Sequence, residues 1–370
     1  MTRPLEIVIL GLSLSSSWGN GHATTFRALI GGLAAEGHRV LFLERDMPWY
    51  AAHRDLPEPG FCDFALYDDI PGLLRDHGAR LRAADAVIVG SYVPEGAAVI
   101  DALAALGPRM LCFYDIDTPV TMGLLDAGEH QYLAPRQVPV FDIYFSFSGG
   151  EVLRHLEDVR GARRAEALYC SVDPALYAPP ERPGWPKWDL GYLGTYSPDR
   201  QPGLEALLLE PARRLPDLRF VVAGSRFPED VDWPGNVERI EHLPPAGHAA
   251  FYGQQRFTLN ITRAAMRAMG WSPSVRLFEA GACGTPLISD RWQGLDEVLP
   301  EGRAVLIADS TEDVISALTD LPEARRSAIA AAARGLVLQR HTGRARAVEL
   351  ARALRAQMAG ADGGRVAASG

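Results

Sequence analysis

The chain has 370 residues, which suits two domains of about 150 to 180 residues each better than a single core. Its 47% of hydrophobic residues is enough to fill both cores. The 37 basic and 46 acidic side chains give a net charge of -9, which argues against a nucleic-acid-binding surface spread over the whole protein. We therefore expect a two-domain globular protein without a nucleic-acid partner.

Cysteine usage and the first residues bear on the compartment. The four cysteines lie far apart, at Cys62, Cys112, Cys170 and Cys283, and have no C-x-x-C spacing. This predicts reduced thiols rather than a zinc site or a disulfide framework. The apolar run 5–12 is too short for a signal-peptide core or a membrane span. We expect a cytoplasmic protein without an integral membrane segment.

The first half alternates between buried strands and helices. Apolar runs predict strands at 5–12, 39–44, 86–90, 109–114 and 141–147. Helical patterns lie between them, at 23–35, 72–82 and 94–106. Strands separated by helices indicate βαβ units and a parallel sheet.

A proline-dense segment at 169–186 predicts a linker, after which the alternation resumes. The second half has strand patterns at 190–193, 218–223, 237–240, 257–261 and 305–307, and helical patterns at 204–214, 246–254, 311–319 and 323–357. We expect domains at 1–173 and 174–342, with the helix at about 343–358 packing back on the first domain and a disordered tail at 360–370.

The stretch 274–290 is the most informative part of the second half. It predicts a helix of small and apolar residues that Gly284 ends and a short strand follows. The helix carries Arg276 and, three residues later, Glu279. This pair is either a salt bridge on an amphipathic helix or part of a functional site, and the stretch alone does not separate the two.

Two loops of the first half lie where α/β sheets bind ligands, at the carboxyl ends of strands. The loop after the first strand contains Gly19 and Gly21, which indicate either a plain tight turn or an anion site against helix N–H groups. Asp115 and Asp117 follow a later strand and form a D-x-D pattern, which in another enzyme fold binds a divalent metal.

The string RLFEAGACGTPLISD at 276–290 with GLDE at 294–297 resembles the donor-site signature of glycosyltransferases with the GT-B fold, and more closely the CgeB-like family. The likeness extends to YLGTYSPDR at 192–200, LNITR at 259–263, the segment 340–346, and, in the first half, SWGNGHATTFR at 17–27, LERDMPWY at 43–50 and FYDIDTP at 113–119. It implies an α/β GT-B fold, in which two tandem Rossmann-like domains face each other across a cleft.

The resemblance implies a donor site in the second domain. Arg200, then Arg276 and Arg263, would neutralise the leaving diphosphate, because preorganised positive charge is the largest contribution to such a reaction. Glu279 would accept hydrogen bonds from the ribose hydroxyls. The remaining expected nucleotide contacts are Gly194, Thr195, Ser274, Gly284 and Thr285. The alternatives are an exposed loop charge for Arg200 and a salt bridge at the edge of the core for Glu279.

The resemblance also implies an acceptor side in the first domain. Gly19, Asn20 and Gly21 would face the diphosphate, and His22 would act as a base or a hydrogen-bond donor. A helix-capping histidine without a catalytic role is the alternative. Asp117 would form a polar wall of the acceptor pocket or serve as the base, and Asp115, Glu44 and Arg45 are further acceptor-side candidates, with a buried Glu44 and Arg45 pair left open.

The function so implied is transfer of a sugar, of the hexosyltransferase type, from a UDP- or dTDP-linked donor to an acceptor hydroxyl. We expect a retaining, metal-independent reaction without a cofactor. The wider retaining family has a second acidic residue eight positions before Glu279, where this chain has Trp271. Alternatives are a nucleotide-sugar epimerase and a non-catalytic nucleotide-sugar-binding protein. The acceptor and the oligomeric state stay open.

Overall fold

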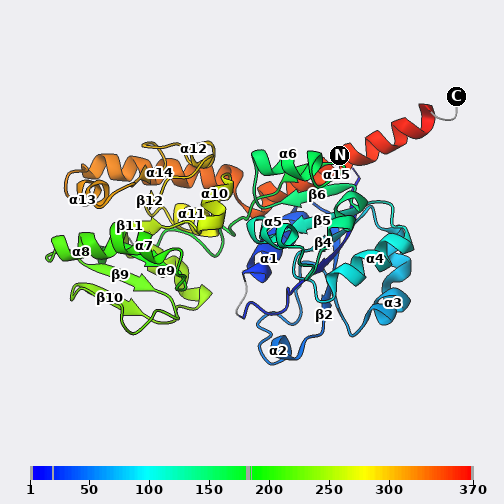
Figure 1. Cartoon of the computed structure of the whole chain (residues 1–370), viewed down its shortest axis with the longest axis horizontal. Coiled ribbons are helices and arrows are strands. Elements are labelled where there is room, and N and C mark those ends of the chain that lie inside the picture. The colour runs from blue at the N-terminus through cyan, green and yellow to red at the C-terminus, as the bar shows by residue number, and fades with distance from the viewer. Residues whose placement is uncertain (1–2, 19–20, 181–183, 185, 368–370) are drawn as a thin grey trace. The chain divides into compact units, whose positions relative to one another are not determined.

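The computed structural model describes residues 3–18, 21–180, 184 and 186–367, with side chains described up to residue 360 (Figure 1). The chain folds into two compact units. The first unit comprises Met1–Ser171 and Thr342–Gly370, and the second comprises Val172–His341. Each unit is a parallel sheet with helices on it.

The first unit contains a seven-stranded parallel sheet in the order β3-β2-β1-β4-β5-β6-β7. Its strands are β1 (Glu6–Gly11), β2 (Arg39–Arg45), β3 (Asp63–Tyr67), β4 (Ala86–Gly90), β5 (Leu111–Asp115), β6 (Ile143–Ser146) and β7 (Ala165–Ala167). Its helices are α1 (His22–Ala35), α2 (Pro48–Ala51), α3 (Ile70–Ala83), α4 (Gly96–Leu106), α5 (Thr118–Ala127), the 3-10 helix Pro135–Val140, α6 (Glu151–Asp158) and α15 (Gly343–Ala367).

The second unit contains a six-stranded parallel sheet in the order β10-β9-β8-β11-β12-β13. Its strands are β8 (Trp188–Leu193), β9 (Phe220–Ala223), β10 (Val237–Ile240), β11 (Gln255–Asn260), β12 (Leu287–Ser289) and β13 (Leu306–Ile307). Its helices are α7 (Gln201–Leu204), the π segment Glu205–Leu209, α8 (Glu210–Arg214), the 3-10 helix Pro245–Gly247, α9 (His248–Gly253), α10 (Ala264–Met269), α11 (Val275–Ala282), α12 (Leu295–Val298), α13 (Thr311–Thr319) and α14 (Glu323–Arg340).

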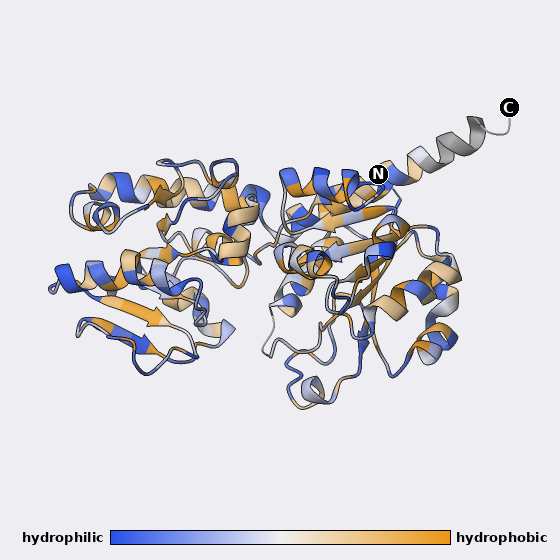
Figure 2. Ribbon diagram, viewed as in Figure 1, coloured by the Kyte–Doolittle hydropathy of each residue, from blue (hydrophilic) through white to orange (hydrophobic). Residues whose placement is uncertain are grey.

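The central strands are apolar along their whole length because helices cover both faces of each sheet. Every residue of β4, β5 and β9 is buried. In Figure 2 these strands are coloured mainly as hydrophobic, and the helices carry hydrophilic residues on their outer sides. Alternation of buried strands and amphipathic helices is therefore enough to specify the two layers around each sheet.

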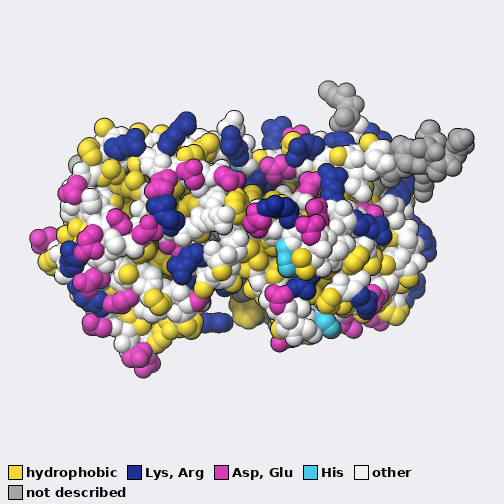
Figure 3. All heavy atoms as spheres, turned by 45° about the horizontal axis from the view of Figure 1, so that its top comes forward, with side chains coloured by type: hydrophobic (Ala, Val, Ile, Leu, Met, Phe, Trp, Pro, Cys, Tyr) yellow, Lys and Arg dark blue, Asp and Glu magenta, His cyan; other side chains and the backbone are white. Residues whose placement is uncertain are grey.

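Surface charge and hydropathy agree with the composition. On the face seen in Figure 3, basic and acidic side chains are interspersed rather than gathered by sign. In the part of the chain that the structure describes, no helix is long and apolar enough to cross a membrane.

The first and last helices of the first unit cross at two glycines. A Cβ atom at Gly32 would lie 2.4 Å from the carbonyl oxygen of Gly343, and one at Gly343 would lie 2.0 Å from the carbonyl oxygen of Ala28. Only glycine permits this backbone contact. The contact places α15, the last helix of the chain, against α1, the helix that follows the first strand.

Several features differ from the sequence-based expectations, among them five helices that were not predicted: α2, α5, α6, α10 and α12. The strands β3 and β7 were not predicted, because both lie at sheet edges and are only partly buried, which weakens their apolar pattern. The tail expected to be disordered from 360 is helical through Ala367. Its helix begins at Gly343 in a packed region, so the tail residues extend a helix that is already nucleated.

The α1–α15 crossing predicts opposite effects for two neighbouring glycines. Gly32→Ala should lower the free energy of unfolding by about 1–3 kcal/mol, because its methyl group overlaps backbone atoms. Gly31→Ala meets no atom within 4 Å and should raise it by about 0.5–1 kcal/mol through helix propensity. Urea unfolding of the two variants measures both changes, and equal effects would contradict the close crossing.

Candidate functional site

In the second unit, two glycine loops meet at the carboxyl ends of β8 and β9. Gly224 has a φ of 153°, and a Cβ atom there would lie 2.0 Å from the carbonyl oxygen of Gly194. A Cβ atom at Gly194 would in turn lie 2.9 Å from Nη2 of Arg276. The missing side chains leave backbone and a guanidinium group close together, which is the kind of surface that a phosphate can approach.

Two arginines line this place, and their hydrogen bonds go to neutral oxygens. Nη2 of Arg200 donates to the carbonyl oxygen of Thr195 over 2.6 Å. Nη1 of Arg276 donates to Oδ1 of Asn260 over 3.2 Å, and its guanidinium group lies 5.2 Å from the ring centre of Tyr192. Nε of both arginines is buried and has no hydrogen-bond partner among the described residues.

The positive charge here is concentrated. Burial lowers the pKa of Arg200, and the nearby charges of Arg276 and Arg263 lower it further. An arginine keeps its proton in proteins, so Arg200 stays charged. Its burial near other positive charges is therefore electrostatically unfavourable until an anion binds. Buried donors and neighbouring positive charges are the features that an anion site requires.

The helix α11 presents Glu279 and Arg276 without pairing them. Ser274 caps the helix by accepting a hydrogen bond from the backbone N–H of Arg276. Glu279 is 6% exposed, and its Oε2 accepts a hydrogen bond from Tyr252 Oη over 3.0 Å. Nδ1 of His248 lies 3.9 Å from the same oxygen. The intrahelical salt bridge considered from sequence is therefore not formed.

Two residues of the expected donor site, Gly284 and Thr285, have other surroundings, whereas Arg263 lies close enough to Arg200 for its charge to lower the pKa of Arg200. Gly284, with a φ of 70°, and Thr285 lie past the carboxyl-terminal end of α11, away from Ser274 and Arg276. Thr285 Oγ1 donates to the carbonyl oxygen of Tyr252 within the core. Arg263 is exposed and precedes α10. The geometry thus gives Gly284 and Thr285 a structural role as a helix end.

Trp271 stands eight positions before Glu279, where the sequence resemblance implies a second carboxylate. It has a φ of 41°, and its ring fills the space beside Gly294, where a Cβ atom would lie 2.4 Å from Cδ1 of the indole. Its backbone N–H donates to the carbonyl oxygen of Gln293 over 2.6 Å. The indole packs against this backbone and offers no acceptor for a sugar hydroxyl.

A buried carboxylate holds the loop that follows β11. Both carboxylate oxygens of Asp290 lie 3.1 Å from the backbone nitrogen of Thr262, and Oδ1 also accepts from Thr262 Oγ1 over 2.8 Å. Burial raises the pKa of Asp290, against the effect of these hydrogen bonds. The carboxylate fixes the loop that begins next to Asn260, the partner of Arg276.

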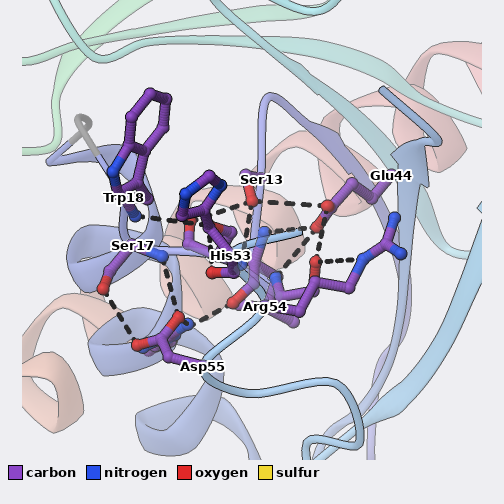
Figure 4. A network of polar contacts seen from close by, with 11 residues as sticks. Ser13, Ser17, Trp18, Glu44, His53, Arg54 and Asp55 are labelled. Carbon is purple, nitrogen blue, oxygen red and sulfur yellow. Dashed lines mark hydrogen bonds and ion pairs between the residues drawn. The ribbon is translucent and has the colours of Figure 1, made fainter. Parts of the chain in front are cut away.

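In the first unit, Glu44 is likewise a buried carboxylate that holds a loop, the one that follows β1 (Figure 4). Its Oε2 accepts from the backbone N–H groups of Leu14 and Ser15 over 2.6 and 2.9 Å. Its Oε1 accepts from the hydroxyls of Ser15 and Ser13 over 2.7 and 3.3 Å. The side chain has no exposed surface. Glu44 therefore anchors a loop, and the expected acceptor contact is not what its surroundings provide.

The next stretch of that loop is fastened to the segment around Asp55 (Figure 4). Asp55 accepts from the backbone N–H and hydroxyl of Ser17 and two hydrogen bonds from Arg27, each over 2.8–2.9 Å. Arg27 holds the pKa of Asp55 well below its usual range. The indole of Trp18 stacks on His53 with ring centres 4.4 Å apart. The loop thus has a defined path up to residue 18.

Arg45 does not pair with Glu44. Its Nη1 donates to Oε2 of Glu95 over 2.6 Å, and its guanidinium group lies 5.8 Å from the ring centre of Tyr67. The open question of a Glu44 and Arg45 pair is thereby resolved: each binds a different partner, one in a loop and one in the turn before α4.

The two carboxylates of the D-x-D pattern differ in their surroundings. Asp115 has no exposed surface, and its oxygens accept from Thr121 Oγ1 and Tyr144 Oη, each over 2.6 Å. Burial raises the pKa of Asp115 to about 6. Asp117 is only partly buried. Asp115 therefore supports the sheet edge rather than contacting an acceptor.

His22 and Asp117 are connected by a residue that the sequence did not single out, Tyr92. The ring of Tyr92 meets that of His22 edge to face with centres 5.2 Å apart, and its hydroxyl lies 3.4 Å from Oδ2 of Asp117. Nδ1 of His22 is buried without a partner among the described residues, and burial lowers the pKa of His22 to about 4. Gly21 precedes α1, while Gly19 and Asn20 lie outside the described residues.

The described residues contain no group of three or more histidine, cysteine, aspartate or glutamate side chains placed to hold a metal ion. Of the residues predicted from sequence, the structure brings Gly194, Thr195, Arg200, Arg263, Ser274 and Arg276 together in the second unit, and His22 near Asp117 in the first. A tyrosine after a strand carries no sequence signal of its own, which explains why Tyr92 was missed.

Comparison with known proteins identifies the fold and matches part of the sequence to a family. Residues 200–352 match the family described as glycosyl transferase-like. No protein with a curated description matches the sequence. The structure is similar to sucrose-phosphate synthase from Thermosynechococcus elongatus, with a TM-score of 0.67, 15% sequence identity, and coverage of 96% of this chain and 100% of that chain.

It is also similar to HepE from Anabaena in complex with UDP and glucose, with a TM-score of 0.66, 13% identity, and coverage of 95% of this chain and 100% of that chain. A glycosyltransferase from Rickettsia africae gives a TM-score of 0.65 at 10% identity, covering 96% of this chain and 99% of that chain. The chain thus has the GT-B fold expected from sequence.

The Glu44 anchor predicts a marked loss of stability in Glu44→Ala, of about 2–4 kcal/mol, because two backbone N–H groups lose their buried acceptor. Asp46→Ala, which removes a partly exposed carboxylate near the same strand end, should cost less than about 1 kcal/mol. Urea unfolding compares the two variants. A similar small loss in both would refute the anchoring role.

His22 predicts a pH dependence of stability. Its pKa is about 4 in the folded chain and 6.5 ordinarily, so protonation favours the unfolded chain. The contribution of neutral His22 to the free energy of unfolding is fully present above pH 6.5. It is lost as the pH falls toward 4, which lowers the free energy of unfolding by up to about 3 kcal/mol. His22→Gln should lose less stability over this interval. Unfolding curves at several pH values measure the difference, and parallel losses would show that His22 is hydrated.

Proposed function

We propose that this protein is a glycosyltransferase that moves a sugar from a nucleotide-sugar donor to an acceptor hydroxyl. The observation that carries the proposal is the pair of buried Nε–H groups of Arg200 and Arg276 beside the Gly194 loop, for which the described residues offer no hydrogen-bond partner. Departure of a nucleoside diphosphate develops negative charge, and donors already in place stabilise it without reorganisation. The match of residues 200–352 to a glycosyl transferase-like family supports the same reaction class.

The proposed donor is a nucleotide sugar linked to UDP or dTDP. HepE, which has the same fold, binds UDP and glucose, which makes UDP-glucose the first donor to test. Glu279 would accept hydrogen bonds from the ribose, with the Tyr252 hydroxyl, which donates to Oε2 over 3.0 Å, holding the carboxylate in place. Gly194, Thr195 and Ser274 would contribute backbone or hydroxyl groups to the phosphates.

The proposed acceptor side lies in the first unit. His22 is neutral at physiological pH because burial lowers its pKa to about 4, so its ring can accept a proton from an acceptor hydroxyl or hydrogen-bond to it. Asp117, partly buried near Tyr92, is the second candidate for this role. A general base must lie within hydrogen-bond reach of the hydroxyl, which either residue could meet.

The reaction is proposed to be metal-independent and retaining. Arginine side chains would supply the positive charge that a divalent ion supplies in other enzymes of this class. Asp115 has both carboxylate oxygens engaged by Thr121 and Tyr144, which removes one ligand from the D-x-D metal alternative. A hexosyltransferase of the CgeB-like type remains the finer proposal, carried by the sequence resemblance.

One observation favours a second candidate, a protein that binds nucleotide sugars without catalysis. Trp271 packs on Gly294 where a carboxylate would contact the donor sugar, so the sugar loses one expected contact. A nucleotide-sugar epimerase is the third candidate. With UDP-glucose and a mixture of acceptors, a transferase releases UDP when an acceptor is present, an epimerase alters the donor alone, and a binding protein does neither.

The donor site predicts the behaviour of three variants toward UDP. Arg276→Ala and Glu279→Ala should weaken UDP binding by about 10–100-fold, corresponding to the loss of one charge-assisted hydrogen bond of about 1.5–3 kcal/mol. Arg200→Ala should lower turnover more than binding, because the charge that it meets grows in the transition state. Calorimetry with UDP and a UDP-release assay measure the two effects.

The matched control is Arg291→Ala, which removes a half-exposed arginine of the same unit that already pairs with Glu301 and Asp309. Its UDP affinity should equal that of the wild type. Unchanged affinity in the Glu279 variant would refute the ribose contact. Loss of activity in EDTA that Mg²⁺ or Mn²⁺ restores would refute metal independence.

A further inference from the structure

The turn between β4 and α4 contains two strained residues. Tyr92 has a φ of 64° and Glu95 a φ of 55°, both in the left-handed region that favours glycine. For side chains other than glycine this conformation costs about 1–3 kcal/mol each, and it persists only where the surroundings enforce it. Such strain is typical of sites where a side chain must point in one particular direction.

The neighbours of the turn hold it in this conformation. Glu95 is tied to Arg45 at the end of β2 by the 2.6 Å ion pair. The ring of Tyr92 packs on that of Tyr132 with centres 4.5 Å apart. Gly96, which follows Glu95, lies so close to Tyr132 that a Cβ atom on Gly96 would be 2.6 Å from the carbonyl oxygen of Tyr132. Contacts on both sides therefore fix the backbone.

The strained backbone brings Tyr92 to two residues on other elements. Its ring meets the ring of His22, at the start of α1, edge to face with centres 5.2 Å apart, and its hydroxyl makes a long hydrogen bond of 3.4 Å to Asp117, directly before α5. Burial raises the pKa of Tyr92 to about 12, so the hydroxyl keeps its proton and donates it at neutral pH. Long contacts of this kind commonly shorten when a substrate binds.

We propose that Tyr92 is a positioning residue of the acceptor site, whose ring keeps His22 out of water and whose hydroxyl orients the Asp117 carboxylate. This inference rests on the proposed function for its catalytic consequence. His22 and Asp117 approach an acceptor from different helices, and a shared neighbour is what keeps their relative geometry constant. The strain in the turn is the cost of placing that neighbour.

A kinetic experiment separates the hydroxyl from the ring. Tyr92→Phe keeps the ring and removes the donor to Asp117. We expect turnover at saturating UDP-glucose, measured as UDP release to water or acceptor, to fall about tenfold with an unchanged KM. Tyr67→Phe is the matched control, because the Tyr67 hydroxyl is buried without a partner among the described residues, and its turnover should match the wild type.

Unchanged turnover in Tyr92→Phe would overturn the proposal, and so would a higher KM at unchanged turnover, which would make Tyr92 a donor contact. If the wild type releases neither UDP from UDP-linked sugars nor dTDP from dTDP-linked sugars, the proposed function fails. The second experiment then still decides the role of Tyr92, because it needs no activity.

That experiment is an NMR titration of His22, assigned by comparison with His22→Gln. The wild-type ring should titrate near pH 4, as its burial implies. In Tyr92→Ala, water reaches the ring and the midpoint should rise by about 1–2 pH units, while in Tyr92→Phe it should stay. Equal midpoints in wild type and Tyr92→Ala would show that Tyr92 does not shield His22 and would overturn the proposal.

Discussion

Buried carboxylates at the carboxyl ends of strands are the interaction on which both candidate sites depend. Glu44 near the end of β2 accepts from the N–H groups of Leu14 and Ser15, and Asp290 after β12 accepts from that of Thr262. Removing a carboxylate from water is costly, and only several charge-assisted hydrogen bonds offset it. A loop that moved away would leave its carboxylate buried and without hydrogen bonds. The carboxylates therefore hold the loops in place, and with them the side chains of the candidate sites.

The arginines of the second unit show the opposite arrangement. Arg200 and Arg276 are partly buried, yet their hydrogen bonds go to a carbonyl, an amide and a hydroxyl oxygen rather than to a carboxylate. Structural arginines in this chain, such as Arg27 with Asp55, are neutralised by bidentate pairing. Arginines whose side-chain hydrogen bonds are not made to a carboxylate are suited to a ligand anion, and this contrast within one chain separates the site from its scaffold.

Sequence patterns were sufficient for much of the fold and for part of the site. The runs of buried apolar residues in β1, β4 and β5 predict parallel strands. Helices cover both faces of a parallel sheet, so its strands carry apolar side chains on both sides. The edge strands β3 and β7 lack that signal. Motif resemblance proposed Arg200 and Arg276, which the structure brings close together, whereas Thr285 and Asp115 were proposed to contact ligands and have buried side chains that are hydrogen-bonded within the core.

By itself the sequence determined most of the strands and helices and where loops leave the sheets, because these depend on local periodicity and turn residues. Only the tertiary structure decided which polar side chains make hydrogen bonds that hold the protein's own loops and which lie at a candidate site. Glu44 and Glu279 are both acidic residues within apolar runs, but one has four donors around it and the other accepts from Tyr252 at the edge of the arginine site. The same holds for Tyr92, whose contacts with His22 and Asp117 arise from three segments distant in sequence. Hydrogen bonds and charges act across space, so their allocation follows from the packing of elements and not from order along the chain.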